Sequence, residues 1–134
     1  MSANRQYDVG ADTHDESSFI IAMQASGELD ERAARALCTE FRRRSAATGS
    51  AFLFADFSGV TSMGAAARKA VLEELRDVRL DAVAVLGASF QIRVLSMLIA
   101  RVLQMFTRHY PLRFFDTEEE ARAWLLEQRR TRGG

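Results

Sequence analysis

Two short runs of consecutive apolar residues constrain the fold of this chain more than any other feature. Residues 52–55 (FLFA) and 81–87 (DAVAVLG) have the length and composition of strands that are covered on both faces, as in a parallel sheet. An amphipathic helical pattern follows each run, over residues 67–78 and 90–108. Strands that alternate with helices predict a mostly parallel sheet with right-handed crossover connections.

Weaker patterns complete the order of elements. Residues 5–25 predict an antiparallel β-hairpin, whose second strand is expected to end before Gly27. A helix is expected after the N-cap residue Asp30, a final short strand at 112–115, and a last helix after the capping residue Thr117. The expected fold class is therefore α/β, a single domain with a mostly parallel sheet, an N-terminal antiparallel hairpin and four helices.

Composition excludes several classes of function. Lysine plus arginine and aspartate plus glutamate each total 18, so no net charge attracts the chain to nucleic acid. One cysteine, two histidines and no Gly-rich phosphate loop predict no metal site and no cofactor. Cys38 lies in a predicted helix, where we expect a small buried hydrophobe. No apolar segment has the pattern of a signal peptide or the length of a membrane span, which predicts a cytoplasmic location without integral membrane association.

The segment after the first apolar run resembles the phosphoswitch of the STAS superfamily, which includes sulfate transporters and anti-sigma-factor antagonists. In that family, Asp-Leu-Ser-x-Val is followed by Asp-Ser-Ser-Gly. Residues 56–60 (DFSGV) match the first half, whereas residues 64–66 (GAA) replace the Asp and the phosphate-accepting Ser. Residues 26–29, 83–90 and 114–125 resemble the SpoIIAA-like branch, which is sometimes grouped as STAS/SEC14.

This resemblance implies a bacterial STAS-like domain over residues 1–130, followed by a frayed tail at 131–134. It implies a non-enzymatic regulatory module that binds a protein partner. The partner-binding candidates are Asp56, Ser58, Gly59, Val60, Thr61, Ser62, Gly64, Ala65 and Ala66. A conventional phosphoswitch is not expected, because an alanine side chain cannot accept a phosphoryl group. Phosphorylation of the nearby hydroxyl groups stays open, although such residues are common in turns.

Ligands of open parallel sheets bind beyond the carboxyl ends of the strands. A crevice near Gly87, Ser89 and Asp116 could hold an anion or a small polar group on helix N-terminal amides. We favour the simpler interpretation, in which Asp56 closes an Asx turn and Ser89 caps a helix. A small enzyme that uses Asp56 or Asp116 is a further alternative. We do not expect it, because no histidine is predicted beside either carboxylate.

The helix predicted at 90–108 has apolar residues over about half of its circumference, whereas a stripe slightly wider than about 100° is enough to seal a core. Three explanations for these additional apolar residues stay open. They could be buried against a neighbouring helix, against a second subunit or regulatory partner, or against an apolar ligand. The alternative function is therefore a carrier or sensor of a lipid-like ligand, held against Leu98 and Ile99. A homodimer is the alternative assembly.

Overall fold

The computed structural model of the protein describes residues 8–11 and 19–133. In chain order, its elements are β1 (Asp8–Ala11), β2 (Ile20–Leu29), α1 (Glu31–Thr48), β3 (Phe52–Met63), α2 (Ala65–Leu75), β4 (Ala82–Leu86), α3 (Phe90–Phe106), β5 (Leu112–Phe115) and α4 (Glu118–Gly133). The predicted α/β fold is confirmed, with β2, β3, β4 and β5 in parallel pairs and four helices.

The strands lie side by side in chain order, from β1 to β5, within the described residues. Phe54 of β3, for example, lies between Ala22 of β2 and Ala84 of β4. Strand β1 pairs antiparallel with β2, and residues 12–18, which carry the loop of the predicted hairpin, lie outside the described residues.

The central strands extend further than their sequence patterns predict. We expected β2 to end before Gly27 and β3 to end in a turn, but β2 continues to Leu29 and β3 to Met63. The two extensions pair with each other in a parallel ribbon, with register shifts between Gln24 and Ser26 and between Gly27 and Glu28. Backbone pairing between the two segments therefore compensates for the weak strand propensity of each.

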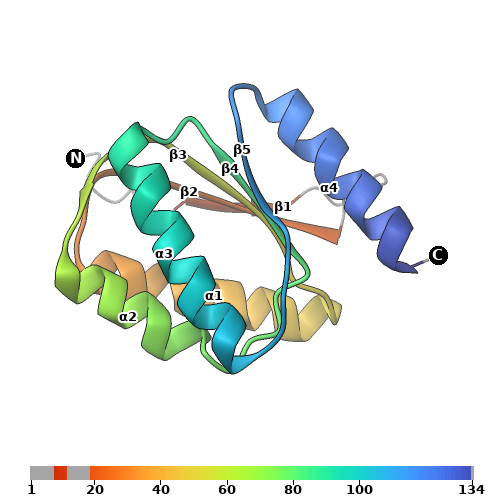
Figure 1. Ribbon diagram of the computed structural model, residues 1–134, viewed down its shortest axis with the longest axis horizontal. Helices are drawn as coiled ribbons and strands as arrows, with labels where there is room; N and C mark the ends of the chain where they lie inside the picture. Colours follow the sequence, from red (N-terminus) through yellow and green to blue (C-terminus); the bar gives the residue numbers. More distant parts are fainter. Residues whose placement is uncertain (1–7, 12–18, 134) are drawn as a thin grey trace.

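Helices α1, α2 and α3 cover one face of the sheet, and α4 covers the other (Figure 1). Each of the first three helices connects neighbouring parallel strands, and right-handed crossovers in one direction place all three on the same side. Helix α4 follows the last strand and makes no crossover. It is therefore free to cover the opposite face.

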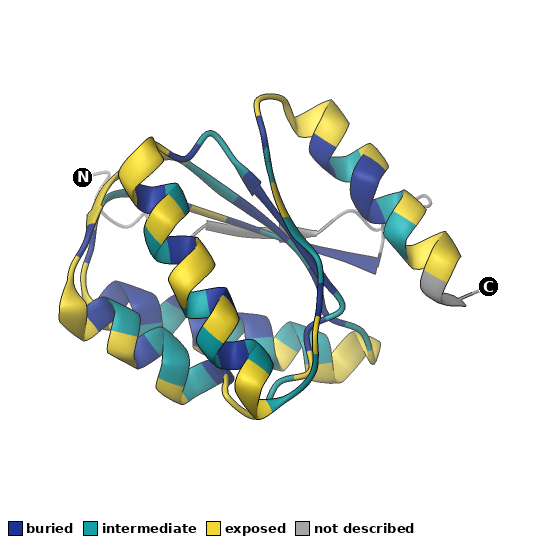
Figure 2. Cartoon of the chain, viewed as in Figure 1, coloured by how far each residue is buried: buried dark blue, intermediate teal, exposed yellow. Residues whose placement is uncertain are grey.

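Successive side chains of a strand point to opposite faces of the sheet, so each face has its own hydrophobic core. Ile21 of β2 and Val83 of β4 pack toward α1, α2 and α3, whereas Phe52 and Phe54 of β3 pack toward Leu125 of α4. Figure 2 shows the buried stripe of α4 that faces the sheet.

Helix α4 is longer than predicted. Residues 131–133, which we expected to be a frayed tail, continue the helix, and the Thr131 hydroxyl donates to the Glu127 carbonyl at 3.0 Å. Arginine is a good helix former, which is consistent with continuation through 129–130.

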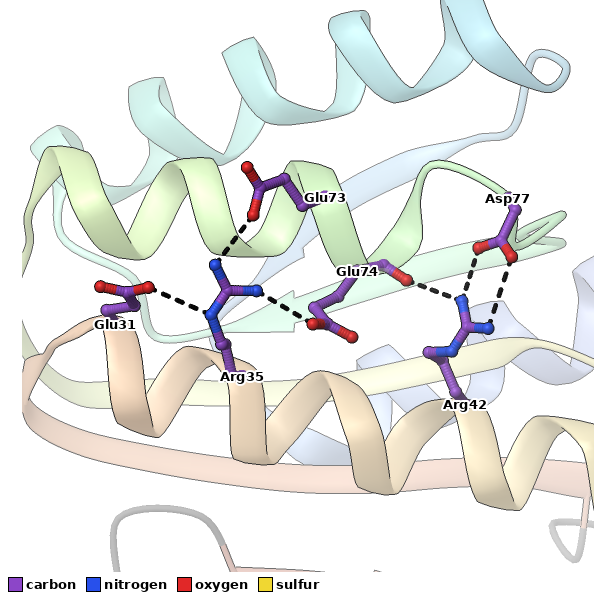
Figure 3. Close-up of polar contacts among 6 residues, drawn as sticks. All are labelled: Glu31, Arg35, Arg42, Glu73, Glu74 and Asp77. Atoms are coloured by element: carbon purple, nitrogen blue, oxygen red, sulfur yellow. Dashed lines mark hydrogen bonds and ion pairs between the residues drawn. The ribbon is translucent and has the colours of Figure 1, made fainter.

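Ion pairs align α1 with α2 (Figure 3). Arg35 donates to Glu73 at 2.8 Å and to Glu74 at 3.0 Å, while Arg42 donates to the Glu74 carbonyl at 2.8 Å and to the Asp77 carboxylate. The hydrogen bond with Glu73 raises the pKa of Arg35, and those from Arg42 lower the pKa of Asp77. These groups are largely solvated, so they fix the alignment of the helices more than they stabilise the fold.

Candidate functional site

Asp56 closes an Asx turn at the position where the pairing of β3 with β4 ends. Its Oδ1 atom accepts from the Ser58 amide at 3.0 Å and from the Ser58 hydroxyl at 2.6 Å. These contacts are those of the Asx turn that the sequence predicts at Asp56. The carboxylate of Asp56 holds its own turn together.

Two glycines allow this turn to pack closely on its neighbours. A Cβ atom on Gly87 would lie 2.5 Å from Ser58 Cβ, and one on Gly59 would lie 2.9 Å from Ser26 Cβ. Gly87 also has a φ of +72°, in the left-handed region that favours glycine. Gly87, which follows the last residue of β4, therefore supports the Ser58 turn directly and lies three residues before the start of α3.

Most of the predicted partner-binding candidates form an exposed surface. The exposed members are Ser58, Gly59, Thr61, Ser62, Gly64, Ala65 and Ala66. Asp56 is half-buried, whereas Val60 is buried in the core beneath α1 and α2. Val60 therefore supports this surface from below.

The other strand ends are occupied by helix caps. The Ser89 hydroxyl accepts from the Ile92 amide at 3.3 Å, and the Thr117 hydroxyl accepts from the Glu120 amide at 3.2 Å. Gly64, at the N-terminus of α2, provides no side-chain cap. The side chains of Ser89 and Thr117 therefore cap helices α3 and α4, as the sequence predicts.

The structure does not enclose Asp116. Its side chain is 91% exposed, and the closest guanidinium nitrogen, on Arg93, lies 3.9 Å from its Oδ1 atom. Among the described residues, no group of three or more His, Cys, Asp or Glu side chains could hold a metal ion. The contacts of Asp56 stabilise its turn. The solvated Asp116 carboxylate has an arginine beside it, which is not the partner that acid–base chemistry needs.

The outward face of α3 is the most unusual surface of the molecule. In the part of the chain that the structure describes, the large hydrophobic residues that are exposed all lie on α3: Phe90, Val94, Met97, Leu98, Met105 and Phe106. Figure 2 shows this exposed face. Part of the apolar excess of this helix does enter the core, through Ile92 and Leu103, but the neighbouring helices do not cover the rest.

An apolar cavity of about 120 Å³ lies behind α3, between the sheet and helices α1 and α2. Ile99 lines it, whereas Leu98 is 55% exposed on the outside of the helix. Ser96 also lines the cavity, and sequence reasoning did not identify it. The signal was present, because Ser96 is the only hydroxyl-bearing residue in α3.

Cys38 of α1 is buried beside the same cavity, as predicted for this residue. Burial raises the pKa of its thiol to about 12. The reactive thiolate is therefore suppressed at neutral pH.

We expect Cys38 to react with Ellman's reagent at pH 8 only when the protein opens or unfolds. The absorbance at 412 nm should rise slowly under native conditions and at once in 6 M guanidinium chloride. Because the pKa of Cys38 is raised by folding, its contribution to stability should be complete below about pH 9 and decrease toward pH 12. Rapid stoichiometric labelling of the native protein at pH 8 would contradict the burial of this thiol.

None of the helices in the described residues is long and apolar enough to cross a membrane. Arg93 and Arg101 interrupt the apolar residues of α3.

The fold and the Asp56 turn define a STAS-like α/β domain. The SpoIIAA-like family matches the chain over residues 20–126, and the protein belongs to that family. SpoIIAA-like domains form a family of protein-interaction regulatory modules.

Two solved structures are similar to the chain. An uncharacterised protein from Shewanella loihica PV-4 with a SpoIIAA-like fold is 21% identical, with a TM-score of 0.64, over 89% of this chain and 93% of that one. The anti-sigma factor antagonist SpoIIAA in its unphosphorylated form is also 21% identical, with a TM-score of 0.58, over 96% of this chain and 99% of that one. At this identity the similarity shows the fold. No curated protein matches the sequence.

Proposed function

We propose that this protein is a non-enzymatic regulatory module that binds a protein partner in the cytoplasm. The binding surface combines the exposed residues of segment 58–66 with the outward face of α3. One observation carries the proposal: the large hydrophobic side chains exposed in the described residues all lie on a single helix. Such a concentration on one element is characteristic of an interaction site.

The two parts of this surface adjoin each other. Ser58 lies against Gly87, and Phe90, which is 81% exposed, begins α3 three residues later. Burying each large apolar side chain removes it from water and contributes about 1.5 to 3 kcal/mol. A partner that covers several of these side chains gains free energy from their burial, and the surplus over the entropy cost of association appears as affinity.

The proposed module works without a conventional serine phosphoswitch. Ala65 and Ala66 begin α2 and carry no hydroxyl group. The Ser58 hydroxyl, which lies nearby, donates to Asp56 within the turn. Noncovalent recognition of the surface is then the means by which the protein conveys a signal.

The test compares exposed substitutions on the two faces of the molecule. Ala66→Arg and Leu98→Asp should preserve folding, because both residues are exposed, but should weaken partner binding at least tenfold. Ala123→Arg on α4 is the matched control, because Ala123 is exposed on the opposite side of the sheet. In-cell crosslinking with mass spectrometry would identify the partner, and calorimetry with the purified partner would give the affinities.

A complex that both surface variants form as tightly as the unmodified protein would contradict the proposal. Light scattering of the purified protein distinguishes a homodimer from a complex with a different protein. If only self-association is lost in Leu98→Asp, the partner is a second copy of the chain. Val60 is unsuitable for this experiment, because Val60→Asp would place a charge in the core.

A further inference from the structure

The cavity behind α3 is large for a protein interior. Interiors are packed closely, and voids larger than a water molecule are few. This cavity has a volume of about 120 Å³, and Leu37, Phe41, Val83 and Leu103 contribute to its apolar wall. An engineered apolar cavity of about 150 Å³ stays dry and binds benzene. The space behind α3 therefore approaches the size of one aromatic ring.

Ser96 supplies an unpartnered polar group to this wall. The residue is 8% exposed, and its hydroxyl oxygen is buried without a hydrogen-bond partner within the described residues. A serine inside a helix commonly donates to the carbonyl four residues earlier, but this hydroxyl does not. A buried hydroxyl without a protein partner is unfavourable, so a hydrogen bond from Ser96 to a molecule in the cavity would be favourable.

The wall that surrounds the Ser96 hydroxyl is almost entirely apolar. A buried water molecule makes two to four hydrogen bonds with its surroundings. Besides Ser96, the lining residues with polar side-chain atoms are Tyr110 and Cys38. Burial raises the pKa of Tyr110 to about 12, so its ring remains uncharged at neutral pH. The site suits a neutral molecule that is mostly apolar.

We propose that this cavity binds a small apolar molecule, about as large as one aromatic ring, that forms a single hydrogen bond with the Ser96 hydroxyl. The ligand contacts the inner side of α3, including Ile99 and Ala100, and leaves the exposed outer side free. A fatty acyl chain is several times larger than one ring. The site thus differs from the lipid-like ligand that the sequence led us to consider against Leu98.

Phenol and toluene provide a matched test, because they have nearly the same shape and only phenol carries a hydroxyl group. Both should bind the full-length protein, raise its melting temperature and slow the labelling of Cys38, which lines the cavity. In Ser96→Ala, the affinity for phenol should fall about tenfold, as expected for one lost hydrogen bond, while that for toluene should be unchanged. Calorimetry would measure both affinities.

The Ala100→Leu variant tests whether the two molecules bind in the cavity or on the exposed face of α3. Ala100 is buried and lines the cavity, so the larger side chain should fill the space and abolish binding of both molecules. Binding that survives in a folded Ala100→Leu variant would overturn the proposal, because it would lie outside the cavity. Equal loss of phenol and toluene affinity in Ser96→Ala would also overturn it. So would the absence of any effect of either molecule on the melting temperature and Cys38 labelling of the unmodified protein, a measurement that needs no variant.

Discussion

Gly87→Ala is expected to lower the free energy of unfolding by about 3 kcal/mol, one of the largest effects of any single substitution in this protein. The left-handed backbone at Gly87, with a φ of +72°, costs about 1 kcal/mol for a residue with a Cβ atom. The new methyl group would also lie 2.5 Å from Ser58 Cβ and 2.9 Å from Ser58 Cα. Relieving that overlap must move backbone, which adds about 2 kcal/mol. Urea unfolding would measure the loss.

Gly49→Ala is the matched control for this prediction. Gly49 ends α1 with a φ of +77°, but a Cβ atom there would meet nothing within 4 Å. Only the backbone cost of about 1 kcal/mol should appear. Amide chemical shifts of residues 56–59 should change in Gly87→Ala and stay constant in Gly49→Ala. Equal destabilisation by both substitutions would show that the Ser58 turn does not pack tightly on β4.

Leu125→Ala is expected to lower the free energy of unfolding by about 3 kcal/mol, because it opens a cavity in the core between α4 and the sheet. Leu125 is 0% exposed and packs among Phe54 and Trp124. The same substitution at Leu98, which is 55% exposed on α3, should change stability by no more than about 0.5 kcal/mol. Chemical denaturation of both variants makes the comparison directly.

The contrast between these two leucines bears on function. If Leu98 contributes little to folding, the fold does not explain the apolar face of α3, which is the result that the proposed partner binding requires. A loss at Leu98 as large as that at Leu125 would instead indicate that this face is covered in the purified protein. Stability would then depend on protein concentration, as expected for a dimer.

Local features of the fold were predictable because their causes lie close together in the sequence. Asp30 accepts from the Ala33 amide at 2.9 Å, and Ser89 caps α3, as their positions before apolar helical patterns indicate. The apolar run that contains Ala82–Leu86 forms a buried central strand. The Asx turn at Asp56 depends on a residue only two positions away.

The extensions of β2 and β3 could not be predicted in the same way. Gly27 normally weakens a strand, yet it lies within β2 with a φ of +73° beside a shift in register. Residues 56–63 contain turn-forming residues and read as a loop. Each segment becomes a strand only because the other supplies its hydrogen bonds, and the two are separated by the whole of α1.

The candidate site shows the same division. The run at 56–66 indicated the family and the exposed turn, but only packing decided that Val60 lies inward while its neighbours remain exposed. The apolar excess of α3 was visible in the sequence, whereas its division between core, cavity and open surface was not. Ser96 became a candidate ligand-binding residue only because its buried hydroxyl has no hydrogen-bond partner within the described residues.

The sequence by itself determined the order of helices and the central strands, the helix caps at Asp30 and Ser89, and the absence of a hydroxyl at residues 65 and 66. Periodicity and capping depend on residues within about four positions, so the chain encodes them locally. The tertiary structure alone decided which apolar side chains are covered, where a cavity remains and which glycines are compressed. Those properties depend on contacts between segments far apart in the chain, which local periodicity cannot specify.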